Sequence, residues 1–210
     1  MKLLLTSAGL CNGSLRKTLK HIVDSKNIRI AFIPTAANVE DGEKDWLIKD
    51  YLNCSKVGSV DIVDISAISK DMWLPRLESA NVILCGGGNP FHLMHWINAS
   101  GLRKILPELL KTRLYVGISA GSMVMCPNLS LSSSNLIYGD KLGRDMPGLN
   151  YVDFYIKPHY NSISFSKARD EFLKPLAQGL GELYALDDES GIKVIEGSVE
   201  IISEGKWKKF

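Results

Sequence analysis

The sequence has few of the features that mark secreted, membrane or metal-bound proteins. Its 210 residues include only four cysteines (Cys11, Cys54, Cys85 and Cys126), and no two of them form a C-x-x-C pair. A disulfide framework needs a denser pattern in a shorter chain, so we expect free thiols and a cytoplasmic protein. No apolar run reaches the roughly 18 residues of a membrane span. The run Leu3–Leu5 is also too short for the core of a signal peptide.

Charge of one sign is not in excess either. Lys and Arg number 25 and Asp and Glu number 23, which gives a formal net charge of +2. This balance gives no electrostatic reason to expect a nucleic acid or an anionic membrane as partner. With 45% hydrophobic residues and no segment typical of an interdomain linker, residues 1–210 are expected to form one domain.

Short apolar runs alternate with amphipathic segments along most of the chain. Strands are predicted at Leu3–Thr6, Ile28–Ile33, Val60–Val63, Val82–Cys85, Leu114–Ile118 and Phe154–Lys157. Helices are predicted at Ser14–Ser25 (with Ser14 as N-cap), Glu43–Asn53, Trp73–Ser79, Pro90–Asn98, Leu102–Lys111 and Ser166–Leu180. The alternation predicts an α/β fold, a doubly wound and mostly parallel sheet with helices on both faces.

The C-terminal part follows a different pattern. Two strand-like runs, Lys193–Ile195 and Val199–Ile202, flank Glu196 and Gly197, which predicts a C-terminal β-hairpin. The last five residues, 206–210, are expected to form a solvated terminus.

The most specific motif is Gly117–Gly121, which reads G-I-S-A-G. It follows a predicted strand and precedes a run that can form a helix. On such a turn Ser119 would project its hydroxyl above the carboxyl end of the sheet, as a nucleophile does. The Ala120 N–H would then sit at a helix N-terminus, where it can donate to an oxyanion. The alternative is a plain turn of small residues.

A second glycine-rich loop, Gly86–Gly88 followed by Asn89, lies between a buried strand and a helix that begins at Pro90. It lacks the Lys-Ser/Thr of a P-loop and does not complete G-x-G-x-x-G. Loops at the carboxyl ends of neighbouring parallel strands converge, so this loop is a candidate second oxyanion donor beside Ser119. The alternative is a turn that requires glycine only for its backbone.

Histidine is the usual base for a serine nucleophile, and the sequence has four. His21 lies within a predicted helix. His92 and His95 have helical spacing but no acidic or cysteine ligand close in sequence, so no metal is expected. His159 follows the predicted strand Phe154–Lys157, and a strand end is where a doubly wound fold builds its site. We therefore predict His159 as general base and then general acid.

The residue that would orient the imidazole is left open by the sequence. The candidates are Asn161, Asp145, Asp153 and the acidic cluster Asp187–Glu189. No general rule chooses among them.

Taken together, the segments G-G-G-N-P-F-x-L, G-I-S-A-G and P-H, in this order and spacing, resemble the S51 serine peptidases, which include peptidase E and the cyanophycinases. Residues 28–36 are also similar to that family. The resemblance implies a fold like that of class I glutamine amidotransferases and no cofactor. It implies Ser119 as nucleophile, His159 as base, and Gly87, Gly88 and Ala120 as oxyanion donors.

Two segments depart from the family pattern. The stretch 131–135 lacks the aspartate of a T-N-D-M-like segment, and 166–171 does not match the basic segment associated with an N-terminal Asp. Asn89, Arg169 and Asp187 are kept as candidates for substrate contact or support.

The resemblance implies a serine hydrolase of small peptides. Two alternatives are an inactive binding protein of the same fold and a serine amidase or esterase with a non-peptide substrate. Besides a small peptide, the expected partner is a second copy of the chain, paired through an apolar helix face such as Pro90–Ile97.

Overall fold

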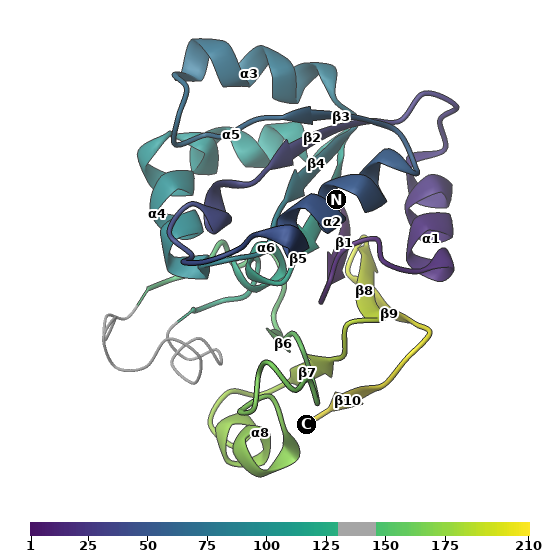
Figure 1. Cartoon of the computed structure of the whole chain (residues 1–210), viewed down its shortest axis with the longest axis vertical. Helices are drawn as coiled ribbons and strands as arrows, with labels where there is room; N and C mark the ends of the chain where they lie inside the picture. The colour runs from purple at the N-terminus through teal and green to yellow at the C-terminus, as the bar shows by residue number, and fades with distance from the viewer. Residues whose placement is uncertain (130–145) are drawn as a thin grey trace.

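In a computed structural model that describes residues 1–129 and 146–210, the chain forms a seven-stranded and a three-stranded sheet (Figure 1). The larger sheet has the order β3-β2-β4-β5-β1-β8-β9. Its parallel strands are β1 (Lys2–Thr6), β2 (Arg29–Ile33), β3 (Ser59–Ile62), β4 (Val82–Cys85) and β5 (Leu114–Ile118). The antiparallel strands β8 (Ser190–Ile195) and β9 (Ser198–Ser203) form the predicted hairpin. The α/β class is therefore confirmed.

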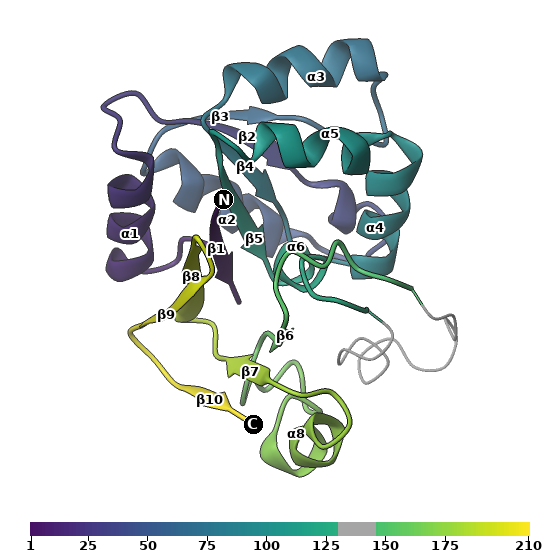
Figure 2. The ribbon, with the colours of Figure 1, turned by 180° about the vertical axis from the view of Figure 1, so that it is seen from behind.

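Helices cover both faces of the large sheet, as the sequence predicts (Figures 1 and 2). On one face α1 (Gly13–Val23) and α2 (Asp45–Ser55) pack on the sheet, with Leu15 and Cys54 in a cluster that includes Leu4. On the other face the core contains residues of α3 (Lys70–Ser79), α4 (Pro90–Ala99) and α5 (Leu102–Leu109). The alternating side chains of β1 separate the two cores, with Leu3 and Leu5 on the second face.

The smaller sheet has the order β10-β7-β6 and lies below the larger one in Figure 1. Its strands are β6 (Tyr155–Lys157), β7 (Leu183–Leu186) and β10 (Trp207–Lys209). The expectation of a solvated C-terminus is wrong, because β10 pairs antiparallel with β7. Two further short helices are η1 (Thr35–Ala37) and α6 (Ala120–Met123).

Several helices begin or end a few residues from their predicted bounds, and two of these differences have a clear physical reason. The helix predicted at Ser166–Leu180 is α8 (Asp170–Ala177), because Arg169 is still extended and Ala168 pairs with Asn161 instead of joining a helix. Helix α1 is capped by Asn12 rather than Ser14. The Asn12 side chain accepts a hydrogen bond of 3.0 Å from the Leu15 N–H.

No helix within the described ranges 1–129 and 146–210 is long and apolar enough to cross a membrane.

Lys157, at the end of β6, is a buried charge-bearing group in this core. Its side chain is fully buried, and its Nζ has no hydrogen-bond partner among the residues described. Burial lowers the pKa of Lys157 to about 7. Folding therefore costs free energy at every pH at which the unfolded chain carries this proton, because the folded chain binds the proton less tightly.

We expect Lys157→Met to stabilise the protein at pH 7 by on the order of 3 kcal/mol, since it removes this desolvation cost. The folded-state pKa is depressed below the ordinary 10.5, so the wild-type penalty grows as pH falls from about 10.5 to about 7. Urea unfolding at pH 7 and pH 9.5 measures the gain in the free energy of unfolding. The control is Lys174→Met, at an exposed lysine. A gain that is no larger at pH 7 than at pH 9.5 contradicts the argument.

Candidate active site

Ser119 lies on a strained turn between β5 and α6. Its φ is 47° and its ψ is −103°, which a non-glycine residue adopts only when the surroundings impose it. The flanking glycines make the turn sterically feasible. A Cβ on Gly117 would come within 2.6 Å of the Ser122 nitrogen, and one on Gly121 within 2.1 Å of the Cys85 carbonyl oxygen. The glycines of the G-x-S-x-G motif are thus required by close packing.

The end of β1 holds this turn in place. The Ser119 N–H and the Ser122 hydroxyl both donate to the Thr6 carbonyl, at 3.0 and 2.8 Å. The Thr6 hydroxyl in turn donates to the Gly117 carbonyl at 2.7 Å. These contacts are fully buried, so they fix the position of the Ser119 side chain relative to β1.

His159 brings its imidazole to the Ser119 hydroxyl. The ring Nε2 lies 3.0 Å from Ser119 Oγ. The ring stacks on Phe165, with centroids 4.2 Å apart and planes inclined by 10°. His159 itself has a φ of 62°, and its backbone N–H donates to the Ser7 hydroxyl at 2.8 Å. Ser7 follows Thr6, so the end of β1 positions both members of this pair.

Asp188 completes the arrangement. Its Oδ1 lies 2.6 Å from His159 Nδ1 and also accepts a hydrogen bond of 3.2 Å from the Ser7 hydroxyl. The hydrogen bond from His159 lowers the pKa of the Asp188 carboxyl, which is therefore ionised at neutral pH. This pattern assigns the proton of the neutral ring to Nδ1 and leaves Nε2 free to accept the proton of Ser119.

The other candidates for the orienting position lie elsewhere. Asp187 holds the turn before β8, where it accepts hydrogen bonds from the Ser190 hydroxyl at 2.6 Å and from the Lys206 N–H. Asp153 and Asn161 are exposed, and Asp145 lies outside the described residues. Within the acidic cluster 187–189 it is Asp188, not Asp187, that reaches the ring. The sequence does not predict the role of Ser7, because a serine at the end of a strand carries no signal for it.

The glycine-rich loop lies beside Ser119. A Cβ built on Gly87 would be 3.6 Å from Ser119 Cβ and 3.6 Å from Trp46 Cζ3. Within the described residues, neither the Gly87 N–H nor the Ala120 N–H has a hydrogen-bond acceptor. Both amides are therefore available to a bound group near the Ser119 hydroxyl.

Comparisons with known proteins show which family the chain belongs to. Residues 3–202 match the model of peptidase family S51. The chain belongs to peptidase family S51. It is 30% identical over 177 residues to an uncharacterized peptidase of Pasteurella multocida, covering 80% of this chain and 82% of that protein. It is 27% identical over 203 residues to a peptidase E of Nostoc sp., covering 89% and 77%.

Solved structures show the same fold. A crystal structure from Listeria monocytogenes EGD-e has a TM-score of 0.79 at 24% identity, and the match covers 97% of this chain and 98% of that one. Membership of family S51 makes the chain a peptidase, that is, a hydrolase.

Three other residues of this S51 peptidase that the sequence predicts for the site are Asn89, Gly88 and Arg169. Asn89 caps α4, since its Oδ1 accepts hydrogen bonds of 3.0 Å from the N–H groups of Phe91 and His92. Gly88 has a φ of 124°, and a Cβ there would meet the Ala36 carbonyl oxygen at 2.3 Å. Arg169 is exposed at the N-terminus of α8.

The other three histidines form no hydrogen bond with Ser119 among the described residues. His21 is exposed on α1, and His92 and His95 contact Trp96 on α4. No group of three metal-ligating side chains occurs in the part of the chain that the structure describes.

The two loop glycines should respond differently to alanine. Gly87→Ala should fold with a stability within about 0.5 kcal/mol of wild type, because its methyl meets only ordinary contacts. That methyl lies over Ser119, so kcat/KM for a peptide substrate should fall at least about tenfold. Gly88→Ala should lose about 2 kcal/mol or more through its backbone conformation and the clash with Ala36. Urea unfolding measures the stability of both variants, and peptide hydrolysis measures their activity. Equal losses of stability in the two variants would refute the separate roles of Gly87 and Gly88.

Proposed function

We propose that this family S51 peptidase hydrolyses small peptides through an acyl-enzyme formed on Ser119, with His159 as general base and then general acid. The observation that carries the proposal is the continuous chain of hydrogen bonds from Ser119 through His159 to Asp188, at 3.0 and 2.6 Å. A hydroxyl, an imidazole and a carboxylate in this order are the components of a serine hydrolase.

In the acylation step Ser119 Oγ attacks the carbonyl carbon of the scissile amide while its proton passes to His159 Nε2. The imidazolium that forms is stabilised by the Asp188 carboxylate at Nδ1. Collapse of the tetrahedral intermediate breaks the C–N bond, and His159 returns the proton to the leaving amine. The acyl group then remains as an ester on Ser119.

The negative charge on the carbonyl oxygen needs donors in the intermediate. The amides of Gly87 and Ala120 supply them in this proposal, because both lie next to Ser119 and neither donates a hydrogen bond within the described residues. The main contribution of Gly88 is the backbone conformation that orients the loop. In the second step water attacks the ester with His159 again as base, and the acid product leaves with the Ser119 proton restored.

Arg169 remains a candidate for contact with a substrate carboxylate. It lies one residue after Ala168, whose carbonyl accepts a hydrogen bond of 2.8 Å from the Asn161 N–H, two residues beyond His159. This hydrogen bond ties the exposed Arg169 to the segment that follows His159. We therefore keep Arg169 in the proposal as a contact for the carboxylate of a short peptide.

Ser119→Ala should lower kcat for a hydrolysed peptide by roughly 10⁴ to 10⁶ without loss of folding, because the members of such a triad act as a unit. A fluorophosphonate should label Ser119 in the wild-type protein, as peptide mapping by mass spectrometry would show. A folded wild-type protein that is not labelled would instead indicate an inactive binding protein of the same fold. Labelled protein that cleaves only esters or non-peptide amides would also overturn the peptidase proposal.

Asp188→Asn should lower kcat by roughly 10³ to 10⁴, since an amide at this position disfavours the ring tautomer that accepts the Ser119 proton. The matched control is the adjacent Asp187→Asn, which should mainly reduce stability because Asp187 anchors the turn before β8. Steady-state kinetics and thermal unfolding of both variants separate the two roles. A larger kcat loss in Asp187→Asn than in Asp188→Asn would reject the triad as drawn.

A further inference from the structure

The aromatic ring of Phe165 lies against the face of the His159 imidazole, and the mechanism above gives this ring no role. The two ring centroids are 4.2 Å apart, and the ring planes are inclined by only 10°. Only 15% of the His159 side chain is exposed, so the stacked ring helps to shield the imidazole from water. The contact therefore concerns the group that carries the proton in both steps of the proposed reaction.

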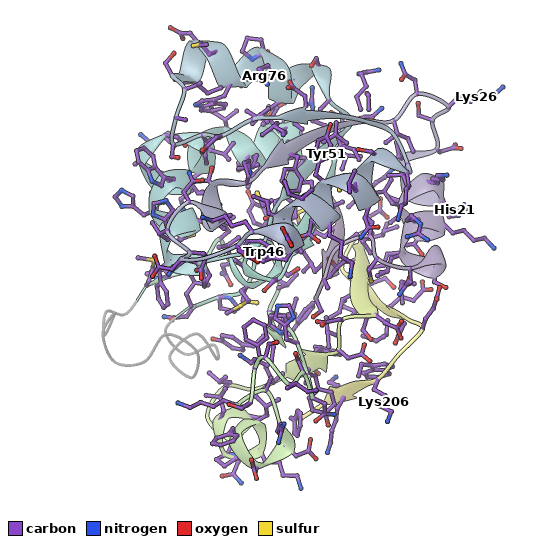
Figure 3. All side chains as sticks on the ribbon, viewed as in Figure 1. His21, Lys26, Trp46, Tyr51, Arg76 and Lys206 are labelled. Atoms are coloured by element: carbon purple, nitrogen blue, oxygen red, sulfur yellow. The ribbon has the colours of Figure 1, made fainter. Side chains whose placement is uncertain are left out.

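No other histidine in the part of the chain that the structure describes has this arrangement. His92 and His95 meet Trp96 edge to face, with ring planes inclined by 70° and 85°. His21 extends from α1 into solvent (Figure 3). Among the described histidines, face-to-face stacking on an aromatic ring thus occurs at the proposed general base alone.

A closed loop holds Phe165 in this place. The Asn161 N–H donates to the Ala168 carbonyl at 2.8 Å, which joins the two ends of the loop. The Ala168 N–H donates to the Phe165 carbonyl, also at 2.8 Å, and Ala168 is fully buried. Between these ends Ile163 is 93% exposed, whereas Phe165 is half-buried. The loop thus leaves one apolar side chain in solvent and turns the aromatic one onto His159.

The face of an aromatic ring attracts a cation. The attraction acts within about 6 Å of the ring centroid and is strongest where water is excluded. A neutral imidazole gains little from it, whereas the imidazolium that forms when Ser119 loses its proton carries a full positive charge. The Asp188 carboxylate, which stabilises the same cation at Nδ1, is about half exposed, so water screens part of its effect. The ring face acts on the cation from a second direction.

We propose that Phe165 is a positioning residue for the general base and stabilises the imidazolium of His159 through the face of its ring. This inference rests on the proposed function, because it requires that His159 takes the proton of Ser119. The attraction becomes strong only as the proton moves, so it lowers the barrier without tightening the binding of the substrate. Loss of the aromatic face should therefore reduce the rate constant and leave the half-saturating concentration unchanged.

The experiment follows the reaction of a fluorophosphonate with Ser119, so that no peptide substrate has to be known. In this reaction the Ser119 oxygen forms a bond to phosphorus, the P–F bond breaks with loss of fluoride, and the hydroxyl proton passes to His159. The imidazolium therefore forms as it does in acylation. Mass spectrometry of the intact protein gives the labelling rate over a series of probe concentrations, and hence the saturating rate and the half-saturating concentration.

The variants change the charge distribution of the ring more than its shape. Phe165 is replaced with phenylalanines that carry one, three or five fluorine atoms on the ring, which withdraw electron density from its face in steps. The saturating rate should fall at each step, and by about tenfold in Phe165→Leu, which has no aromatic face. Phe165→Tyr keeps the face and should react within about twofold of wild type. The matched control is the same fluorinated series at the exposed Phe172 on α8, which should leave the rate unchanged.

A saturating rate that is the same across the fluorinated series at position 165 contradicts the proposal, even where Phe165→Leu is slow, because a role in packing alone depends on the shape of the ring and not on its charge. A change confined to the half-saturating concentration contradicts it as well. Thermal unfolding shows whether Phe165→Leu is folded, and the fluorinated series decides without that variant. A wild-type protein that does not react with the fluorophosphonate would overturn the proposed function itself, whereas a reactive one whose rate is insensitive to the ring overturns only this inference.

Discussion

The contact between the Ser119 hydroxyl and the His159 imidazole, 3.0 Å across, is the constraint on which the rest of the site depends. The two residues come from different sheets, Ser119 after β5 and His159 after β6. The site therefore exists only because the carboxyl end of β5 in the large sheet meets the ends of β6 and β7 in the small one. Asp188, in the turn between β7 and β8, links the two sheets from the other side of the ring.

The end of β1 provides the rigidity that this contact requires. Ser119 and His159 both have positive φ values, 47° and 62°, each of which costs on the order of 1–3 kcal/mol. The backbone N–H of Ser119 is held by the Thr6 carbonyl, and that of His159 by the Ser7 hydroxyl. Two adjacent residues thus fix both strained positions, and Ser7 also donates to Asp188. The Ser7 hydroxyl is thus the bridge between the His159 backbone and the Asp188 carboxylate.

Much of the fold could be predicted from the sequence, because strands buried on both faces appear as continuous apolar runs. Val82–Cys85 and Leu114–Ile118 match β4 and β5 to the residue. Ser119 and His159 could be predicted because each follows such a run in a motif with few alternatives. The sequence could not single out Asp188 within its acidic cluster. The neighbouring side chains are all carboxylates, and only the structure shows which of them points at His159. The pairing of β10 with β7 and the bridging role of Ser7 depend on contacts between residues more than 20 positions apart, on which local patterns carry no information.

The central claim is that Ser119 and His159 act as one catalytic unit, and the coupling between them tests it most directly. The measurement is the rate of peptide hydrolysis by Ser119→Ala, His159→Ala and the double variant. If each side chain works only through the other, the double variant should be no slower than the slower single variant. Losses that multiply in the double variant would mean that the two side chains act independently, and the account of the site would be contradicted.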